Sequence, residues 1–186
     1  MIESQRVLHG KRVILRPLAS GDLPRCVTWF SDPRVTQFLG RNAGITLAEE
    51  ERWFRAYERR ADEQIFAIEV AGSHVGNVGL HRVDRAHRKA ELGILIGEAG
   101  LWSRGLGTDA IRAVLRYAFA GLGLHKVSLD VLPTNRRAIR AYEKAGFVRE
   151  GVHREDLYKD GRFVDVVRMG ILEGEFERAE AAGAAA

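Results

Sequence analysis

The residues best suited to do chemistry in this chain form a glycine-containing turn, Arg104-Gly105-Leu106-Gly107-Thr108, directly before an amphipathic segment of helical period. Glycines carry no side chain, so such a turn exposes backbone N–H groups at a helix start, where the helix dipole also favours negative charge. Arg104 adds a guanidinium group with a planar set of donors. The pattern predicts a phosphate-bearing cofactor at residues 104–108.

The same turn also fits the dinucleotide fingerprint G-x-G-x-x-G/A over residues 105–110, with Asp130 at the distance of a ribose-binding carboxylate. Two features of the context favour another kind of site. Glu98-Ala99-Gly100 separates the preceding strand from the turn, and one strand, one helix and a hairpin follow it, whereas a dinucleotide fold repeats strand–helix units. A dinucleotide-binding protein stays an alternative.

A second set of candidate residues lies on a later helical segment that begins at Asn135. Asn135 has the residue type of a helix N-cap, and Gly146 that of the glycine which ends a helix. Tyr142 lies two turns into this segment, on the face that carries Ala138. Because a buried tyrosine hydroxyl needs a partner, Tyr142 is both a core aromatic residue and a candidate functional group.

Hydrophobic periodicity and turn residues predict the elements that position these side chains. Helices are predicted over residues 20–32, 46–60, 108–120 and 135–145, and strands over residues 7–16, 64–70, 74–83, 90–97, 126–132, 148–158 and 162–172. This order predicts an α+β fold with a mixed, mostly antiparallel central sheet and helices on both faces. We expect residues 1–173 to form a single domain and residues 174–186 a frayed tail.

Composition narrows the classes of function. The net charge is +4 and 46% of the residues are hydrophobic, but no apolar run has the length of a membrane span or of a signal-peptide core. We therefore expect a cytoplasmic protein without a membrane partner. The single cysteine, Cys26, excludes an internal disulfide and a cysteine-cluster metal site, and no metal is expected. The arginines are scattered, so a nucleic-acid-binding domain is the least favoured class.

Together, the two sets of residues resemble the GNAT superfamily of acetyl-coenzyme A-dependent N-acetyltransferases. The resemblance is nearer to its branch that acetylates the N-termini of ribosomal proteins. It covers nearly the whole chain and includes the segments Val13–Leu18, Ala90–Gly93 and Asp165–Met169. The chain departs from the superfamily at Trp102, where Arg or Gln is frequent, although Trp is usual in the resembling branch.

The resemblance implies acetyl-coenzyme A as co-substrate. Its pyrophosphate is expected on the N–H groups of residues 104–108, and its pantetheine arm is expected to pair with the strand near residues 94–96. Asn135 is expected to contact the arm, and Tyr142 to lie near the sulfur. The expected cofactor-binding residues are Ile94, Leu95, Ile96, Arg104, Gly105, Leu106, Gly107, Thr108, Asn135 and Tyr142.

The implied reaction is attack of a neutral amine on a thioester carbonyl, and the expected catalytic residues are Tyr142, Glu91 and Asn135. Tyr142 would protonate the leaving thiolate, and a backbone N–H near residues 94–96 would stabilise the charge that develops on the carbonyl oxygen. Glu91 would accept the proton of the amine; alternatively, it is a strand-end carboxylate paired with an arginine such as Arg88. His81 is a second candidate proton acceptor.

The expected acceptor is a protein N-terminal α-amine or a small amine, such as a polyamine, an aminoglycoside-like antibiotic or an amino-acid-like amine. A non-catalytic coenzyme A-binding or regulatory module is the alternative. The resemblance is also compatible with a homodimer. Acceptor choice is expected from the two early helices, the 31–45 segment and the last hairpin, with Trp29, Phe30, Asp32, Trp53, Asp156 and Tyr158 as lining candidates.

Overall fold

The structure is a computed structural model that describes residues 6–40 and 44–184. In chain order its elements are β1 (Leu8–His9), β2 (Ile14–Pro17), η1 (Ser20–Asp22), α1 (Leu23–Phe30), α2 (Pro33–Thr36), α3 (Leu47–Tyr57), β3 (Gln64–Val70), β4 (Ser73–Asp84), β5 (Lys89–Ile96), η2 (Ala99–Leu101), α4 (Leu106–Arg116), the π-helical turn η3 (Tyr117–Gly121), β6 (Lys126–Val131), α5 (Arg136–Ala145), β7 (Val148–Lys159), β8 (Arg162–Leu172) and α6 (Glu173–Ala184).

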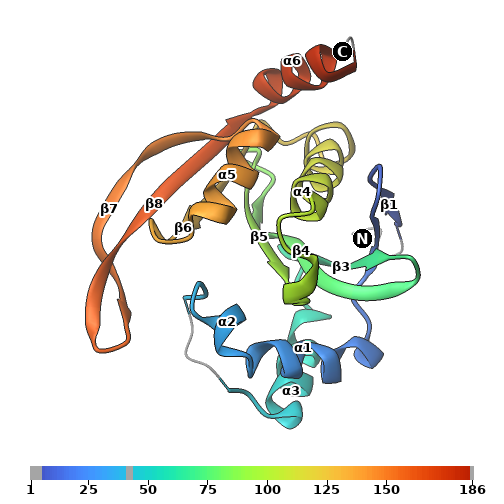
Figure 1. Cartoon of the computed structure of the whole chain (residues 1–186). Coiled ribbons are helices and arrows are strands. Elements are labelled where there is room, and N and C mark those ends of the chain that lie inside the picture. The colour runs from blue at the N-terminus through green and yellow to red at the C-terminus, as the bar shows by residue number, and fades with distance from the viewer. Residues whose placement is uncertain (1–5, 41–43, 185–186) are drawn as a thin grey trace.

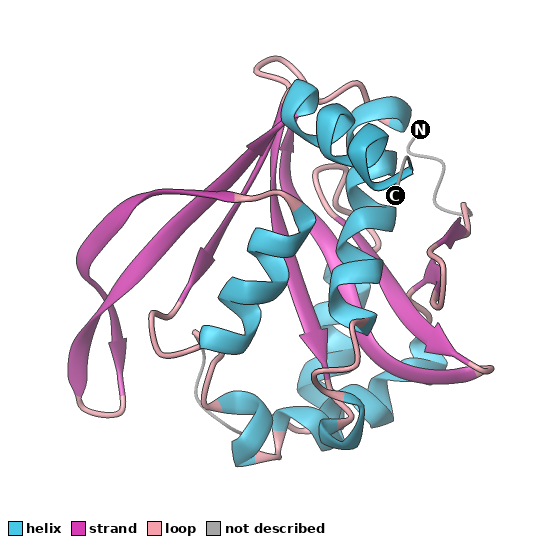
Figure 2. Ribbon diagram, turned by 45° about the horizontal axis from the view of Figure 1, so that its top comes forward, coloured by secondary structure: helices cyan, strands magenta, loops and turns pink. Residues whose placement is uncertain are grey.

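The strands form one sheet in the order β1-β2-β3-β4-β5-β6-β8-β7 (Figure 1). Neighbouring strands are antiparallel except β5 and β6, which run parallel. Helices α1 and α3 pack on one face of the sheet, and α4 and α5 on the other (Figure 2). The predicted α+β fold, with a mixed, mostly antiparallel sheet and helices on both faces, is confirmed.

Alternation along β3 shows how both faces are buried. Phe66 and Ile68 belong to a larger core that includes residues of α4 and α5. Ile65 and Ala67 belong to a smaller core with residues of α1 and α3. Because both faces are covered, β3 is a nearly continuous apolar run in the sequence.

Local sequence signals fix the helix ends near the candidate site. The Asn135 side chain accepts a hydrogen bond from the backbone N–H of Ala138, which caps α5. Gly146 ends α5 with φ 106°, a left-handed conformation that glycine adopts without steric cost. Further upstream, Thr46 and Glu49 form the capping box that starts α3.

The N-terminal segment differs from the prediction of one strand over residues 7–16. It forms two short strands, β1 and β2, because the chain turns at Gly10, whose N–H donates to the Val13 carbonyl at 2.9 Å.

The C-terminal segment differs as well. The tail predicted to be frayed from residue 174 forms helix α6, because Phe176 is buried against Phe119, with 5.5 Å between the ring centroids. Within the described residues, no helix combines the length and the apolar character needed to cross a membrane.

Candidate active site

The parallel strands β5 and β6 separate along their length and form a wedge. They pair only from Lys89 with Lys126 to Glu91 with Ser128. Beyond that point, no strand of the described residues pairs with residues 92–96 of β5 on the side of β6. An unpaired strand edge offers backbone donors and acceptors to an extended ligand. The wedge therefore has the geometry to bind an extended chain that carries amide groups.

The start of α4 forms one wall of the wedge. Gly105, the N-cap, has φ 80° and ψ −2°, a left-handed conformation that favours glycine. The first N–H groups of α4 have no acceptor within the helix, and the helix dipole adds positive potential there. A Cβ added at Gly107 would lie 3.9 Å from the side chains of Ile94 and Ile96, an ordinary van der Waals distance, so the turn borders β5 and a methyl group would still fit between them. This arrangement suits a phosphate group.

The position of this turn is fixed by Asp109. Its carboxylate accepts hydrogen bonds from the backbone N–H groups of Lys11, Arg12 and Val13 at 2.9, 2.7 and 3.1 Å. The Arg12 side chain donates to the Arg104 carbonyl. The connection between β1 and β2 thus holds the first turn of α4 in place.

Helix α5 forms the opposite wall and carries Asn135 and Tyr142. Asn135 uses its Oδ1 atom as the helix cap, at 3.2 Å from the Ala138 nitrogen, which leaves its NH2 group free for a ligand. Tyr142 is buried, and within the described residues its hydroxyl makes no hydrogen bond. Burial raises the pKa of Tyr142 to about 12, so its hydroxyl is protonated at neutral pH.

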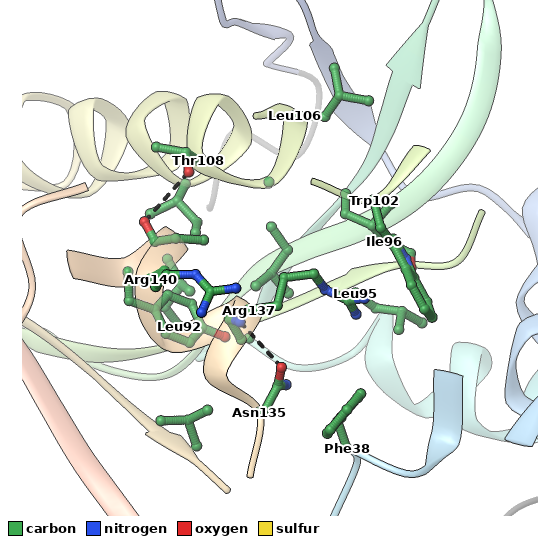
Figure 3. A pocket seen from close by; sticks show the side chains of 18 of the residues that line it. Phe38, Leu92, Leu95, Ile96, Trp102, Leu106, Thr108, Asn135, Arg137 and Arg140 are labelled. Atoms are coloured by element: carbon green, nitrogen blue, oxygen red, sulfur yellow. Dashed lines mark hydrogen bonds between the residues drawn. The ribbon is translucent and has the colours of Figure 1, made fainter. Parts of the chain in front are cut away.

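The two walls enclose a cavity of about 480 Å³ (Figure 3). The residues predicted to hold the cofactor line it, with the exception of Arg104, whose side chain is exposed and lies outside the lining. The lining members of that set are Ile94, Leu95, Ile96, Gly105, Leu106, Gly107, Thr108, Asn135 and Tyr142.

Several charged residues of the cavity were missed by the sequence analysis. Arg137, Arg140 and Lys144 line it from α5, and their spacing of three and four residues places them on one helix face. That spacing was the signal that could have identified them. Asp130, considered in the sequence only as a ribose-binding residue, lines the cavity from β6.

Glu91 lies where the wedge begins, and it is not among the residues that line the cavity. Its Oε2 atom accepts from Arg82 at 2.9 Å and its Oε1 atom from Arg168 at 3.2 Å. Arg168 also donates to Asp130 at 3.0 Å. Glu91 is therefore a strand carboxylate paired with arginines, as in the alternative to its role as proton acceptor, and its partners are Arg82 and Arg168. Arg88 instead donates to the Gly123 carbonyl.

His81 is the cross-strand partner of Glu91 and also lies outside the cavity lining. Its Nδ1 atom is 3.8 Å from a Glu63 carboxylate oxygen. Its Nε2 atom is 2.9 Å from the point where a Cβ of Gly93 would lie, so the imidazole covers this glycine. Of Glu91, His81 and Asp130, the residue that lines the cavity is Asp130.

The six side chains proposed for the acceptor do not line the cavity. Trp29 is buried in the smaller core, and Asp32 caps α2. The early part of the chain contributes Val35, Phe38, Leu39 and Gly40 instead, from α2 and the turn after it. These residues belong to the predicted 31–45 segment, of which residues 41–43 lie outside the described residues.

The cavity fits coenzyme A. The free edge of residues 92–96 can pair with the amides of the pantetheine arm, and the turn at residues 105–108 can hold the pyrophosphate. Arg140 and Lys144 add positive charge for phosphate groups.

Comparison with known proteins agrees with this assignment. The acetyltransferase (GNAT) domain family matches residues 12–148. A spermidine N(1)-acetyltransferase of Vibrio cholerae is 30% identical over 90% of this chain and 96% of its own length. That of Escherichia coli (strain K12) is 29% identical over 88% of each chain.

A solved structure of spermidine N-acetyltransferase from Vibrio cholerae, in complex with CoA and spermine, matches with a TM-score of 0.84. It shares 30% identity, and the match covers 89% of this chain and 98% of that one. The family match spans most of the chain, and the cavity fits the family's cofactor. The chain therefore belongs to the GNAT acetyltransferase family and is an acetyl-coenzyme A-dependent N-acetyltransferase.

Proposed function

We propose that this enzyme acetylates the primary amine of a small aliphatic amine, and that spermidine is the first compound to test. The proposal rests chiefly on Asp130, the one carboxylate among the described residues that line the cavity. The same cavity has apolar residues from the early part of the chain, including Phe38 and Leu39. A carboxylate attracts an ammonium group, and apolar side chains bury methylene groups. A small amine on a methylene chain combines both features.

The relatives support the same class of acceptor. The proteins from Vibrio cholerae and Escherichia coli that align over most of this chain are spermidine N(1)-acetyltransferases. The V. cholerae structure with CoA and spermine has the same fold.

A protein N-terminal α-amine is the second candidate, as expected for the branch that acetylates ribosomal proteins. It is favoured by similarity to YdaF of Bacillus subtilis (strain 168), which is provisionally assigned as a ribosomal N-acetyltransferase. YdaF is 35% identical, but over only 57% of each chain.

When bound, acetyl-coenzyme A supplies the acetyl group as a thioester. We propose that backbone N–H groups of residues 94–96 donate to the carbonyl oxygen, which becomes more negative as the amine attacks. The free NH2 group of Asn135 donates to an oxygen of the arm. Arg104 contributes its backbone to the turn. Its side chain lies outside the cavity and adds positive charge near the proposed pyrophosphate site.

Tyr142 faces the leaving sulfur in this proposal. Burial alone raises its pKa to about 12, so the hydroxyl is neutral and able to donate. Because this pKa is above that of an ordinary thiol, about 8.5, the first interaction is a hydrogen bond that stabilises the thiolate, with proton transfer following as charge develops.

We propose that Asp130 accepts the proton of the attacking amine, directly or through a water molecule. Both oxygens of Glu91 already accept hydrogen bonds from guanidinium groups, and His81 covers Gly93 outside the cavity. Glu91 then acts as a positioning residue, because it holds Arg168, which in turn holds one oxygen of Asp130.

The test is a comparison of kcat/KM for spermidine, an aminoglycoside and a peptide with a free N-terminus, measured by mass spectrometry of the acetylated product. We expect spermidine to be the best of the three, and Asp130→Asn to lower kcat/KM for it by at least about tenfold. Asp156→Asn is the matched control, since Asp156 is exposed on β7 and does not line the cavity. A peptide preferred by a hundredfold over spermidine would reject the proposal in favour of the second candidate.

A further inference from the structure

Trp102 occupies the position at which the chain departs from the superfamily pattern, and the structure gives it a defined role at the end of β5. Its Nε1–H donates to the Ile96 carbonyl at 2.7 Å. This hydrogen bond fixes the indole ring against the wall of the cavity formed by the turn before α4. Because the Ile96 carbonyl oxygen already accepts this hydrogen bond, we expect an extended ligand to pair with β5 only up to Leu95.

Arg137 reaches this ring from the opposite wall. Its Cζ atom lies 3.7 Å from the centroid of the Trp102 ring and 5.8 Å from that of Phe38. Figure 3 shows the Arg137 side chain between α5 and Trp102. All three residues line the cavity. The side chain thus connects α5 with the turn before α4 across the wedge.

Among the residues that the structure describes, the guanidinium of Arg137 is held by the aromatic rings of Trp102 and Phe38. Within the described residues it makes no ion pair and no hydrogen bond, and burial lowers its pKa from the ordinary arginine value. Arg168, by contrast, is paired with two carboxylates. A stacked guanidinium keeps its N–H donors in the plane of the group, free for the oxygens of a ligand.

We propose that Arg137 and Trp102 form a latch over the pantetheine arm. The arm lies along residues 92–95 of β5, beneath the stacked pair, and the guanidinium donates to an oxygen of the ligand. Because the stack joins the two walls, it must part before coenzyme A can leave. Arg137 is therefore a positioning residue that sets how long the cofactor stays bound.

The test measures cofactor exchange rather than acetylation. Dissociation of coenzyme A is followed by stopped-flow displacement of a fluorescent coenzyme A analogue from the full chain. A partly desolvated cation–π contact is worth about 1–2 kcal/mol, so we expect the dissociation rate of Arg137→Ala to rise about five- to thirtyfold. The association rate should not fall.

Arg136→Ala is the matched control. Arg136 precedes Arg137 on α5 and carries the same charge, but it is exposed and does not line the cavity. Its dissociation rate should stay within twofold of the wild type. Arg137→Lys keeps the charge and loses the planar stack, so it should release coenzyme A nearly as fast as Arg137→Ala.

Three results would overturn the latch. The first is an Arg137→Ala dissociation rate equal to that of the wild type. The second is slower association with unchanged dissociation, which would assign Arg137 to electrostatic attraction. The third is wild-type dissociation in Arg137→Lys, which would show that charge alone suffices. Thermal unfolding of each variant without ligand shows whether the fold is intact.

Discussion

Replacing Tyr142 by phenylalanine should separate catalysis from folding. The hydroxyl has no hydrogen-bond partner among the described residues, so its removal leaves no donor or acceptor unsatisfied. The free energy of unfolding should therefore change by less than about 1 kcal/mol. Burial raises the pKa of Tyr142 from 10.0 to about 12, a shift that corresponds to about 2.7 kcal/mol in favour of the neutral, donating form.

Loss of that donor should lower kcat by about a hundredfold or more, because it acts on charge that develops at the sulfur. The affinity for acetyl-coenzyme A should not change, since the turn at residues 105–108 and the edge of β5 are untouched. The measurements are steady-state release of coenzyme A, calorimetric titration with acetyl-coenzyme A, and thermal unfolding.

Tyr57→Phe is the control with the opposite outcome. The Tyr57 hydroxyl accepts a hydrogen bond from the Ile65 N–H at 3.0 Å, between α3 and β3. Its loss leaves a backbone donor without a partner, so we expect a destabilisation of about 1–3 kcal/mol with kcat unchanged. The reasoning is refuted if Tyr142→Phe turns over at the wild-type rate with saturating substrates. It is also refuted if both variants are destabilised equally, because Tyr142 would then have a structural partner.

Three further predictions concern the turn before α4 and the smaller core. Gly105→Ala should lower the free energy of unfolding by about 1–2 kcal/mol in a urea titration, because φ is 80° there, whereas Gly107→Ala should not. Asp109→Asn should both lower the melting temperature and weaken coenzyme A binding in calorimetry, since an NH2 group cannot accept from the backbone N–H groups that this carboxylate holds. Burial raises the pKa of the Cys26 thiol from 9.0 to about 11. The thiol therefore ionises at lower pH in the unfolded chain than in the folded one, and the free energy of unfolding should fall as the pH rises from 9 to 11. Urea titrations should show a loss of up to about 2.7 kcal/mol from this group, and Cys26→Ala should lack that contribution.

The sequence predicted those parts of the fold that depend on local signals. Helix α5 was found because its cap at Asn135 and its final Gly146 lie within the segment itself. Helix α6 was missed because its stability depends on Phe176 packing against Phe119, a contact that no local pattern in an alanine-rich tail reveals. The separation of β5 from β6 also depends on pairing between distant segments.

The same distinction applies to the candidate site. Strand alternation indicated which face of β5 carries Glu91, but not that Arg82 and Arg168, from β4 and β8, already bind its carboxylate. The cavity-lining position of Asp130 follows from the opening of the wedge and was equally hidden. The turn at residues 104–108 could be proposed as a cofactor site from the sequence because its chemistry is contained in five consecutive residues, of which residues 105–108 line the cavity.

The wedge has a consequence for how this enzyme could diversify. Ile94 and Ile96 of β5 pack against the larger core, whereas Leu95 packs against the smaller one with α1 and α3. In the proposed binding mode, recognition of the cofactor uses the backbone edge of the strand, which every sequence provides, while α2 and its following turn contribute residues to the cavity. On that proposal, mutations in the early region could change acceptor preference over evolutionary time without altering the edge proposed to bind coenzyme A.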